Sequence, residues 1–375
     1  MSKLKLMTIL GTRPEIIRLS AVIKKADLYF DHVLVHTGQN YDVQLNDVLF
    51  EELGLREPNY YLGVAGGHLG ATMGAIIEKS YEVISKEKPD AVLILGDTNS
   101  ALSAISAKRL KVPIFHMEAG NRCWDWNVSE MINRRIVDAI ADINLPYTEN
   151  SRKYLLSEGV DGKTIFVTGS PMTEVLATHS HAINRSQVLE ALDLTEDGYI
   201  LVSAHREENI DIEENFVSLM NAINEVAESY QLPVIYSVHP RSKKFIEQRN
   251  FEFHPLVRSL KPFGFFDYNK LQKSAYCVLS DSGTLSEESA ILDFPGVLIR
   301  TSTERPEALD GGTVVIGSIT TKSILQAVEL SVSMHENGHF GTLPFDYQDF
   351  NASTKVIKII QSYTDIVNRT TWLKR

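Results

Sequence analysis

Short apolar segments alternate with longer amphipathic segments along most of the 375 residues. The apolar segments have the length of buried strands, and the amphipathic ones repeat apolar residues near the 3.6-residue period of a helix. This alternation is typical of parallel β-sheets covered by helices. The strands expected in a first series are residues 4–10, 33–36, 91–95, 113–116, 143–145 and 164–167, and those in a second series are residues 199–203, 233–237, 256–260, 276–279, 296–299 and 313–316.

Two successive series of strands predict two domains, because a chain of this length exceeds what one hydrophobic core usually supports. We expect an α/β fold with a first Rossmann-like domain at residues 1–177 and a second at 178–353. A helical stretch at residues 354–375 is expected to pack back on the first domain. Ligands of such sheets bind outside the carboxyl ends of the strands, so the pattern also predicts a cleft between the two halves.

Composition excludes several classes of protein. The chain has 37 basic and 48 acidic residues, a net charge of −11, which argues against nucleic-acid binding. It contains no apolar run long enough for a membrane helix and no signal-peptide pattern, so a cytoplasmic location is expected. Its 2 cysteines lie far apart, and neither a disulfide framework nor a metal site is predicted. The loops that bind nicotinamide cofactors and P-loop phosphates are absent, as are the GxSxG and HExxH motifs.

The first polar cluster follows the first expected strand. Thr12 and Glu15 match a capping box, and Pro14 suits the first turn of a helix. Capping alone would explain these three residues. It does not explain Arg13 and Arg18, which flank a helix N-terminus and are therefore predicted to contact phosphate.

Three carboxylates follow later strands of the first domain. Asp97 either caps the next helix or faces a ligand, and Glu118 lies just past an apolar strand. Glu118 could form a routine ion pair with Arg122. Glu130 and Arg134 lie downstream. Burial raises and nearby arginines lower the pKa of a carboxyl, which is how a general acid or base is tuned, so the group is interpreted as functional.

The first polar cluster of the second expected domain contains a histidine. His205 and Arg206 follow the strand expected at residues 199–203, where a catalytic and a structural role are equally plausible. His239 follows the next strand and could equally mark a simple turn.

A later segment of the second domain has the features of a pyrophosphate site. Ser282 and Gly283 open an expected helix, whose exposed amides favour an anion. Glu287 or Glu288, one turn later, could accept hydrogen bonds from ribose hydroxyls. Arg305 adds a cation.

Taken in order, these clusters resemble the non-hydrolysing UDP-N-acetylglucosamine 2-epimerase family. The resemblance implies a fold similar to the GT-B glycosyltransferases, a homodimer, a UDP-linked 2-acetamido sugar as substrate and no added cofactor. It makes Asp97, Glu118 and Glu130 the acid/base candidates. His205 is a further catalytic candidate. It assigns contacts with the substrate and UDP to Arg13, Arg18, Arg122, Arg134, Arg206, His239, Ser282, Gly283, Glu288 and Arg305.

Departures from the family pattern bear on the sugar. The sequence Asn121-Arg122-Cys123 is similar to the branch that makes UDP-N-acetyl-L-fucosamine from UDP-2-acetamido-2,6-dideoxy-L-talose for capsule or O-antigen. We therefore expect that reaction, with UDP-N-acetylglucosamine 2-epimerisation as the alternative. Ser129 and Met131 differ from the usual Pro-Glu-Glu. Residues 39–42 and 66–68 replace segments that support substrate activation, so we expect that activation to be lost. A hydrolysing epimerase, a GT-B glycosyltransferase and a non-catalytic sensor are more distant alternatives.

Overall fold

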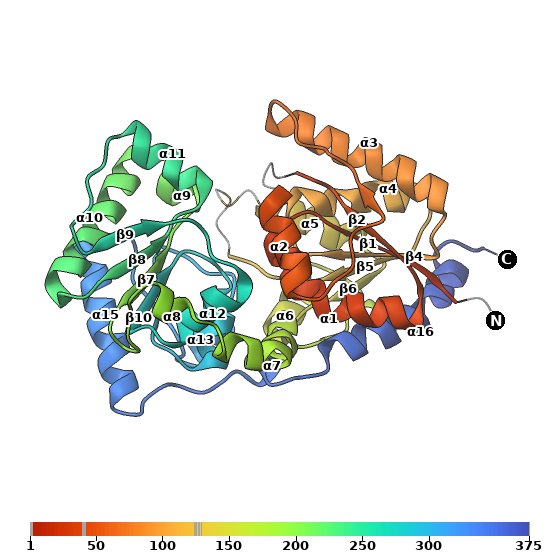
Figure 1. The fold of residues 1–375 in the computed structure, drawn as a ribbon. Coiled ribbons are helices and arrows are strands. Elements are labelled where there is room, and N and C mark those ends of the chain that lie inside the picture. Colours follow the sequence, from red (N-terminus) through yellow and green to blue (C-terminus); the bar gives the residue numbers. More distant parts are fainter. Residues whose placement is uncertain (1–2, 40–42, 124–125, 127, 129, 375) are drawn as a thin grey trace. The chain divides into compact units, whose positions relative to one another are not determined.

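The computed structural model describes residues 3–39, 43–123, 126, 128 and 130–374 (Figure 1). The chain divides into two compact units. The first comprises Met1–Thr178 and Gln348–Arg375, and the second comprises His179–Tyr347. Among the helices of the described residues, none combines the length and apolar composition needed to cross a membrane.

The first unit is built on a six-stranded parallel sheet with the order β3-β2-β1-β4-β5-β6. Its strands are β1 (Lys5–Leu10), β2 (Asp31–His36), β3 (Tyr60–Tyr61), β4 (Ala91–Leu95), β5 (Ile114–Met117) and β6 (Ile143–Leu145). Met7 in β1 pairs with Val33 on one side and Val92 on the other. All five residues of β4 are buried, as expected for a central strand covered on both faces.

Helices cover both faces of this sheet. They are α1 (Arg13–Tyr29), α2 (Val43–Glu52), α3 (Leu69–Glu87), α4 (Ser103–Arg109), α5 (Glu130–Ile140), α6 (Glu149–Ser157) and α16 (Ala352–Thr370). Helix α7 (Pro171–Asn184) begins in the first unit and ends in the second. Helices α3 and α4 pack together on one face, and α1 packs with α16 on the other (Figure 1). The apolar core under α3 and α4 includes Ile76, Ile84 and Ala104.

The second unit repeats this architecture with the strand order β12-β11-β10-β7-β8-β9. Its strands are β7 (Ile200–Ser203), β8 (Val234–Ser237), β9 (Val257–Leu260), β10 (Cys277–Ser280), β11 (Gly296–Leu298) and β12 (Val315–Ile316), all parallel. Its helices are α8 (Val188–Ala191), α9 (Glu207–Ile210), α10 (Glu213–Tyr230), α11 (Pro240–Gln248), α12 (Phe265–Lys273), α13 (Leu285–Leu292), α14 (Pro306–Asp310) and α15 (Thr321–Glu336). One apolar core lies under α10 and α15, and a second includes residues of α8, α12 and α13.

These two Rossmann-like units confirm the predicted fold class, which is that of the GT-B-like proteins. One expected strand is wrong. Residues 164–167 form no strand: a 3₁₀ turn (Gly162–Thr164) is followed by a single bridge from Ile165 to Asn144. One short strand, β3, is absent from the expected set, since two residues are too few for a recognisable alternation.

Candidate functional site

The connection between β1 and α1 is organised around a buried glutamate. Glu15 Oε2 accepts hydrogen bonds from the Gly11 amide (3.1 Å) and from Thr12 Oγ1 (2.7 Å). The Thr12 side chain makes no capping bond, so the predicted capping box is only half formed. Burial raises the pKa of Glu15 to about 7 despite these hydrogen bonds. A side chain at Gly11 would collide with Thr37, whose Oγ1 lies 1.9 Å from the position of a Cβ.

Two predicted carboxylates meet two predicted arginines at the carboxyl ends of β4 and β5. Arg134 Nη2 lies 2.5 Å from Asp97 Oδ2 and 3.1 Å from Glu118 Oε1. Arg18 forms a buried ion pair with Glu118 Oε2. The Arg18 guanidinium also lies over the Tyr147 ring, 5.8 Å from its centroid. Strands β1, β4 and β5 are neighbours in the sheet, which brings residues distant in sequence into one cluster.

The backbone at Glu118 is held in an unfavourable conformation. Glu118 has a φ of +60°, a left-handed conformation that costs a non-glycine residue about 1–2 kcal/mol. Its carbonyl oxygen accepts a hydrogen bond from Arg134 Nη1. Backbone strain of this kind is found at ligand and active sites. Glu118 is also 7% exposed, so this side chain is almost wholly buried.

The remaining candidates of the first unit lie in different environments. Arg13 is half-buried as the first residue of α1. Glu130 is exposed as the first residue of α5, one helical turn before Arg134, whereas the preceding residue, Ser129, lies outside the described residues. Arg122 does not pair with Glu118.

The Arg122 guanidinium is instead enclosed by two other carboxylates. Arg122 Nη2 lies 2.8 Å from Asp138 Oδ2 and 2.6 Å from Glu158 Oε2. Arg122 is 1% exposed, and both of these carboxylate partners belong to the first unit. The hydrogen bonds from Arg122 hold the pKa of Glu158 below its ordinary value.

A second cluster lies at the carboxyl ends of β7 and β10, around Asp281. Asp281 Oδ2 accepts hydrogen bonds from the amides of His205 and Arg206 (2.9 Å each). Asp281 Oδ1 lies 3.3 Å from His205 Nδ1. The His239 ring is 5.5 Å from the His205 ring, centroid to centroid, so the two predicted histidines lie side by side. The central role of Asp281 is not apparent from sequence.

Three arginines of the second unit surround Glu304. Arg300 donates two hydrogen bonds to its carboxylate (3.2 and 3.1 Å), and Arg206 Nη2 donates a third (3.1 Å). Burial opposes ionisation of Glu304, but the charges of Arg206, Arg300 and Arg305 outweigh it and hold the pKa of this carboxyl well below its ordinary value. A Cβ at Gly283 would lie 3.1 Å from Glu304 Oε2. Glu304 belongs to the polar segment at residues 303–307 that carries the family resemblance, whereas Arg300 is not among the predicted residues, although it too follows the end of β11.

The predicted pyrophosphate segment borders this cluster. Arg305 Nε donates to the Gly283 carbonyl oxygen (3.1 Å), and Arg305 Nη2 lies 3.1 Å from Glu287 Oε2. Helix α13 begins directly after Thr284, whose hydroxyl lies 2.9 Å from that of Ser282. Glu288 is buried and accepts a hydrogen bond from Gln272 Nε2 (2.7 Å). Among the described residues, no group of three or more His, Cys, Asp or Glu side chains could hold a metal ion.

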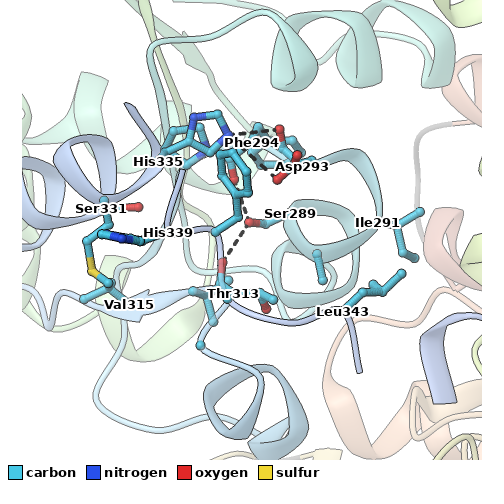
Figure 2. Close-up of a pocket in the computed structure, with 17 residues that line it drawn as sticks. Ser289, Ile291, Asp293, Phe294, Thr313, Val315, Ser331, His335, His339 and Leu343 are labelled. Carbon is cyan, nitrogen blue, oxygen red and sulfur yellow. Dashed lines mark hydrogen bonds and ion pairs between the residues drawn. The ribbon is translucent and has the colours of Figure 1, made fainter. Parts of the chain in front are cut away.

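Figure 2 shows a pocket of about 350 Å³ elsewhere in the second unit. Its lining includes Phe294, Thr313, His335 and Leu343, and none of the predicted site residues. Pro295, which precedes β11, places this pocket at the amino end of that strand. The predicted residues of this unit follow the carboxyl ends of its strands, so the pocket is not part of their cluster.

Comparisons with known proteins show which family the chain belongs to. The sequence profile described as UDP-N-acetylglucosamine 2-epimerase matches residues 23–361. A solved structure of UDP-N-acetylglucosamine 2-epimerase from Rickettsia bellii is 45% identical, with a TM-score of 0.91 and coverage of 99% of this chain and 100% of that one. The Methanocaldococcus jannaschii UDP-GlcNAc 2-epimerase, solved with UDP-GlcNAc and UDP, is 32% identical, with a TM-score of 0.90 and coverage of 96% and 100%.

A further relative indicates that the sugar varies among these proteins. The UDP-2,3-diacetamido-2,3-dideoxy-D-glucuronate 2-epimerase of Pseudomonas aeruginosa is 32% identical over 88% of this chain and 92% of its own length. The matched profile and these relatives extend over both units. The chain therefore belongs to the UDP-N-acetylglucosamine 2-epimerase family and is a nucleotide-sugar 2-epimerase.

Proposed function

We propose that the chain interconverts UDP-N-acetylglucosamine and UDP-N-acetylmannosamine. The observation that carries the proposal is the pair of carboxylates, Asp97 and Glu118, that share the Arg134 guanidinium at the ends of adjacent strands. Epimerisation at C2 needs acid/base groups of this kind. The names of the Rickettsia and Methanocaldococcus relatives support this sugar as the substrate.

The proposed reaction has two balanced halves. A base removes the proton at C2 while the C1–O bond to UDP breaks, which leaves a 2-acetamidoglycal with a C1–C2 double bond. A proton then arrives at C2 from the opposite face, and UDP adds back at C1. We assign the proton transfers to Asp97, Glu118 and Glu130. Arginine cations stabilise the charge that develops on the departing diphosphate, a role proposed for Arg13, Arg18 and Arg134.

The second unit is proposed to bind the UDP portion. The Gly283 amide and the Ser282 hydroxyl, which precede α13, suit a diphosphate, while Glu288 suits the ribose hydroxyls. The Ser282 amide itself donates to Ser280 Oγ (3.1 Å). His205, with Asp281 against its Nδ1, is proposed as a further catalytic group, with Arg206 and His239 beside it. Arg305 positions the Gly283 backbone through its hydrogen bond to the Gly283 carbonyl.

The L-fucosamine reaction is the second candidate. The sequence Asn121-Arg122-Cys123 favours it, and Cys123, Val128 and Met131 form an apolar cluster that would suit a 6-deoxy sugar. Two polar groups of the motif are engaged within the first unit, however. Asn121 Oδ1 accepts a hydrogen bond from Ser151 (2.6 Å), and Arg122 pairs with acidic side chains. Because these side chains already have partners within the unit, they are less suited to recognise a sugar by hydrogen bonds. We therefore propose the glucosamine substrate first.

Deuterium incorporation distinguishes the two substrates. Each UDP sugar is incubated with the protein in deuterated water, and deuterium at C2 is measured by proton NMR. We expect exchange with UDP-N-acetylglucosamine and formation of its manno epimer. Exchange confined to the 6-deoxy-L-talose derivative would establish the second candidate instead. Phosphorus NMR on the same samples tests for free UDP, whose accumulation would indicate hydrolysis.

We further propose that the protein acts as a cytoplasmic homodimer in the supply of precursors for surface polysaccharide. The family resemblance and the UDP-sugar substrate support these assignments.

Loss of substrate activation also stays a prediction, because residues 40–42 lie outside the described residues. His68, in the other replaced segment, accepts a hydrogen bond from the Ala71 amide (3.1 Å) and caps α3. A hyperbolic dependence of rate on substrate is expected.

A further inference from the structure

A buried aspartate that the reaction does not use lies directly behind the acid/base cluster. Asp138 is in α5, four residues after Arg134, so the two side chains share one face of that helix. Asp138 is 3% exposed. Its two carboxylate oxygens each lie 3.2 Å from the Gly120 amide nitrogen, which donates to them. The carboxylate therefore holds the backbone two residues after Glu118.

The same carboxylate also contacts His116, which links it to the neighbouring strand. Asp138 Oδ1 lies 3.0 Å from His116 Nδ1. On the other side of the ring, His116 Nε2 lies 2.8 Å from the Gly96 carbonyl oxygen. A carbonyl oxygen and a carboxylate oxygen both only accept hydrogen bonds, so these two contacts require a proton on Nε2 and on Nδ1 of His116. Gly96 directly precedes Asp97, so the chain of contacts extends from Asp138 to both proposed acid/base loops.

The backbone at these loops requires such support. Glu118 has a φ of 60°, which is sparsely populated for a residue with a side chain, whereas Gly96 and Gly120 adopt their φ values of 70° and 80° without strain. Residues in sparsely populated conformations persist only when surrounding contacts determine them. Arg122 completes the arrangement, because its guanidinium neutralises Asp138 from the side away from His116. A buried carboxylate needs such a partner to remain charged.

We propose that Asp138 is a positioning residue for the epimerase reaction, which sets the backbone of Glu118 through the Gly120 amide and that of Asp97 through His116. It does not touch the substrate. The inference rests on the acid/base role proposed for Glu118 and Asp97, and it applies to whichever UDP sugar the protein turns over. Displacement of a catalytic group by a fraction of an ångström reduces the rate of reaction more than the binding of substrate.

The test compares Asp138→Asn with Glu158→Gln. Both substitutions are isosteric and remove one carboxylate from Arg122, but only the first changes the contacts with Gly120 and His116. We expect Asp138→Asn to lower kcat by about 100-fold with KM within about threefold of the original value. Glu158→Gln should keep kcat within about twofold. UDP affinity, measured by calorimetry, should be unchanged in both variants.

A second variant and a direct backbone measurement complete the design. If Asp138→Asn does not fold, His116→Gln takes its place and should lower kcat with KM retained, because it breaks the link to Gly96. Hydrogen exchange at the Gly120 amide, followed by mass spectrometry, should accelerate in Asp138→Asn and not in Glu158→Gln. A kcat within twofold of the original and unchanged Gly120 exchange would overturn the inference. If the unmodified protein does not act on UDP-N-acetylglucosamine, only the proposed substrate is overturned. The hydrogen exchange of the Gly120 amide needs no substrate, so it still tests the positioning role of Asp138.

Discussion

At the scale of single residues, the arginines near the proposed acid/base groups pair with protein carboxylates. Arg18 and Arg134 both contact Glu118, and Arg134 also contacts Asp97. The sequence predicts these residues at one edge of the sheet because the segments that carry them follow strands. It could not specify the pairs, because partners separated by as many as 100 residues are chosen by the tertiary packing.

Glu15 provides a test of the electrostatics at this scale. The unfolded chain releases the Glu15 proton near pH 4.5, while burial keeps it bound in the folded protein up to about pH 7. The folded state therefore binds more protons between these values, and its stability falls as the pH rises through them. We expect Glu15→Gln, which cannot ionise, to escape this loss. Its free energy of unfolding relative to the original protein should increase by about 3 kcal/mol from pH 4 to pH 8.

Urea unfolding at a series of pH values provides the measurement. The exposed Glu82→Gln, in α3, is the matched control and should show no comparable trend. The difference in free energy of unfolding between Glu15→Gln and the original protein could instead stay constant across this pH range. That result would mean that Glu15 has the same pKa in the folded and unfolded states.

At the scale of secondary-structure elements, local patterns were sufficient for most of the fold. Apolar runs such as β4 and β10 were recognisable because parallel strands are buried on both faces. Residues 164–167 have the same composition but form only one bridge, since strand formation depends on a partner as well as on apolar side chains. The predicted helices do not include α5, although its first residue, Glu130, is a predicted site residue.

Gly120, in the loop that follows β5, leads to a second prediction. Gly120 has a φ of +80°, and a Cβ there would lie 2.5 Å from the Ser151 carbonyl oxygen and 2.8 Å from Leu155 Cγ. We expect Gly120→Ala to lower the free energy of unfolding by about 2–4 kcal/mol, from backbone strain and overpacking together. Gly74→Ala, in the middle of α3 with open space around the Cβ position, should instead raise it by about 0.5–1 kcal/mol.

Chemical denaturation of both variants checks this pair. Because both changes add one methyl group, opposite signs show that the surroundings and backbone conformation of Gly120, and not the methyl group itself, cause its loss of stability. Equal stability of Gly120→Ala and the original protein would show that the left-handed turn is not required.

At the scale of the whole molecule, each unit carries its polar cluster at the carboxyl ends of its own parallel sheet. This placement followed from the alternation of strands and helices together with the position of polar residues after strands. The sequence did not indicate the buried charges that support the clusters. Asp138 is recognisable only from its contacts, because an acidic residue in a helix is usually solvated and nothing local marks this one. Asp281 and Glu304 lie in predicted polar segments, but their roles as centres of hydrogen bonding depend on partners distant in the sequence.

Deuterium exchange at C2 of the UDP sugar, measured for the original protein and for Asp97→Asn and Glu118→Gln, tests the central claim most directly. Removal of a positioned acid or base costs about 100-fold or more in rate. We expect the original protein to exchange C2 of UDP-N-acetylglucosamine, both variants to lose exchange by at least about that factor, and both to retain UDP binding in calorimetry. Exchange at the original rate in both variants, with UDP still bound, would contradict the assignment of the acid/base chemistry to the Asp97–Glu118 pair.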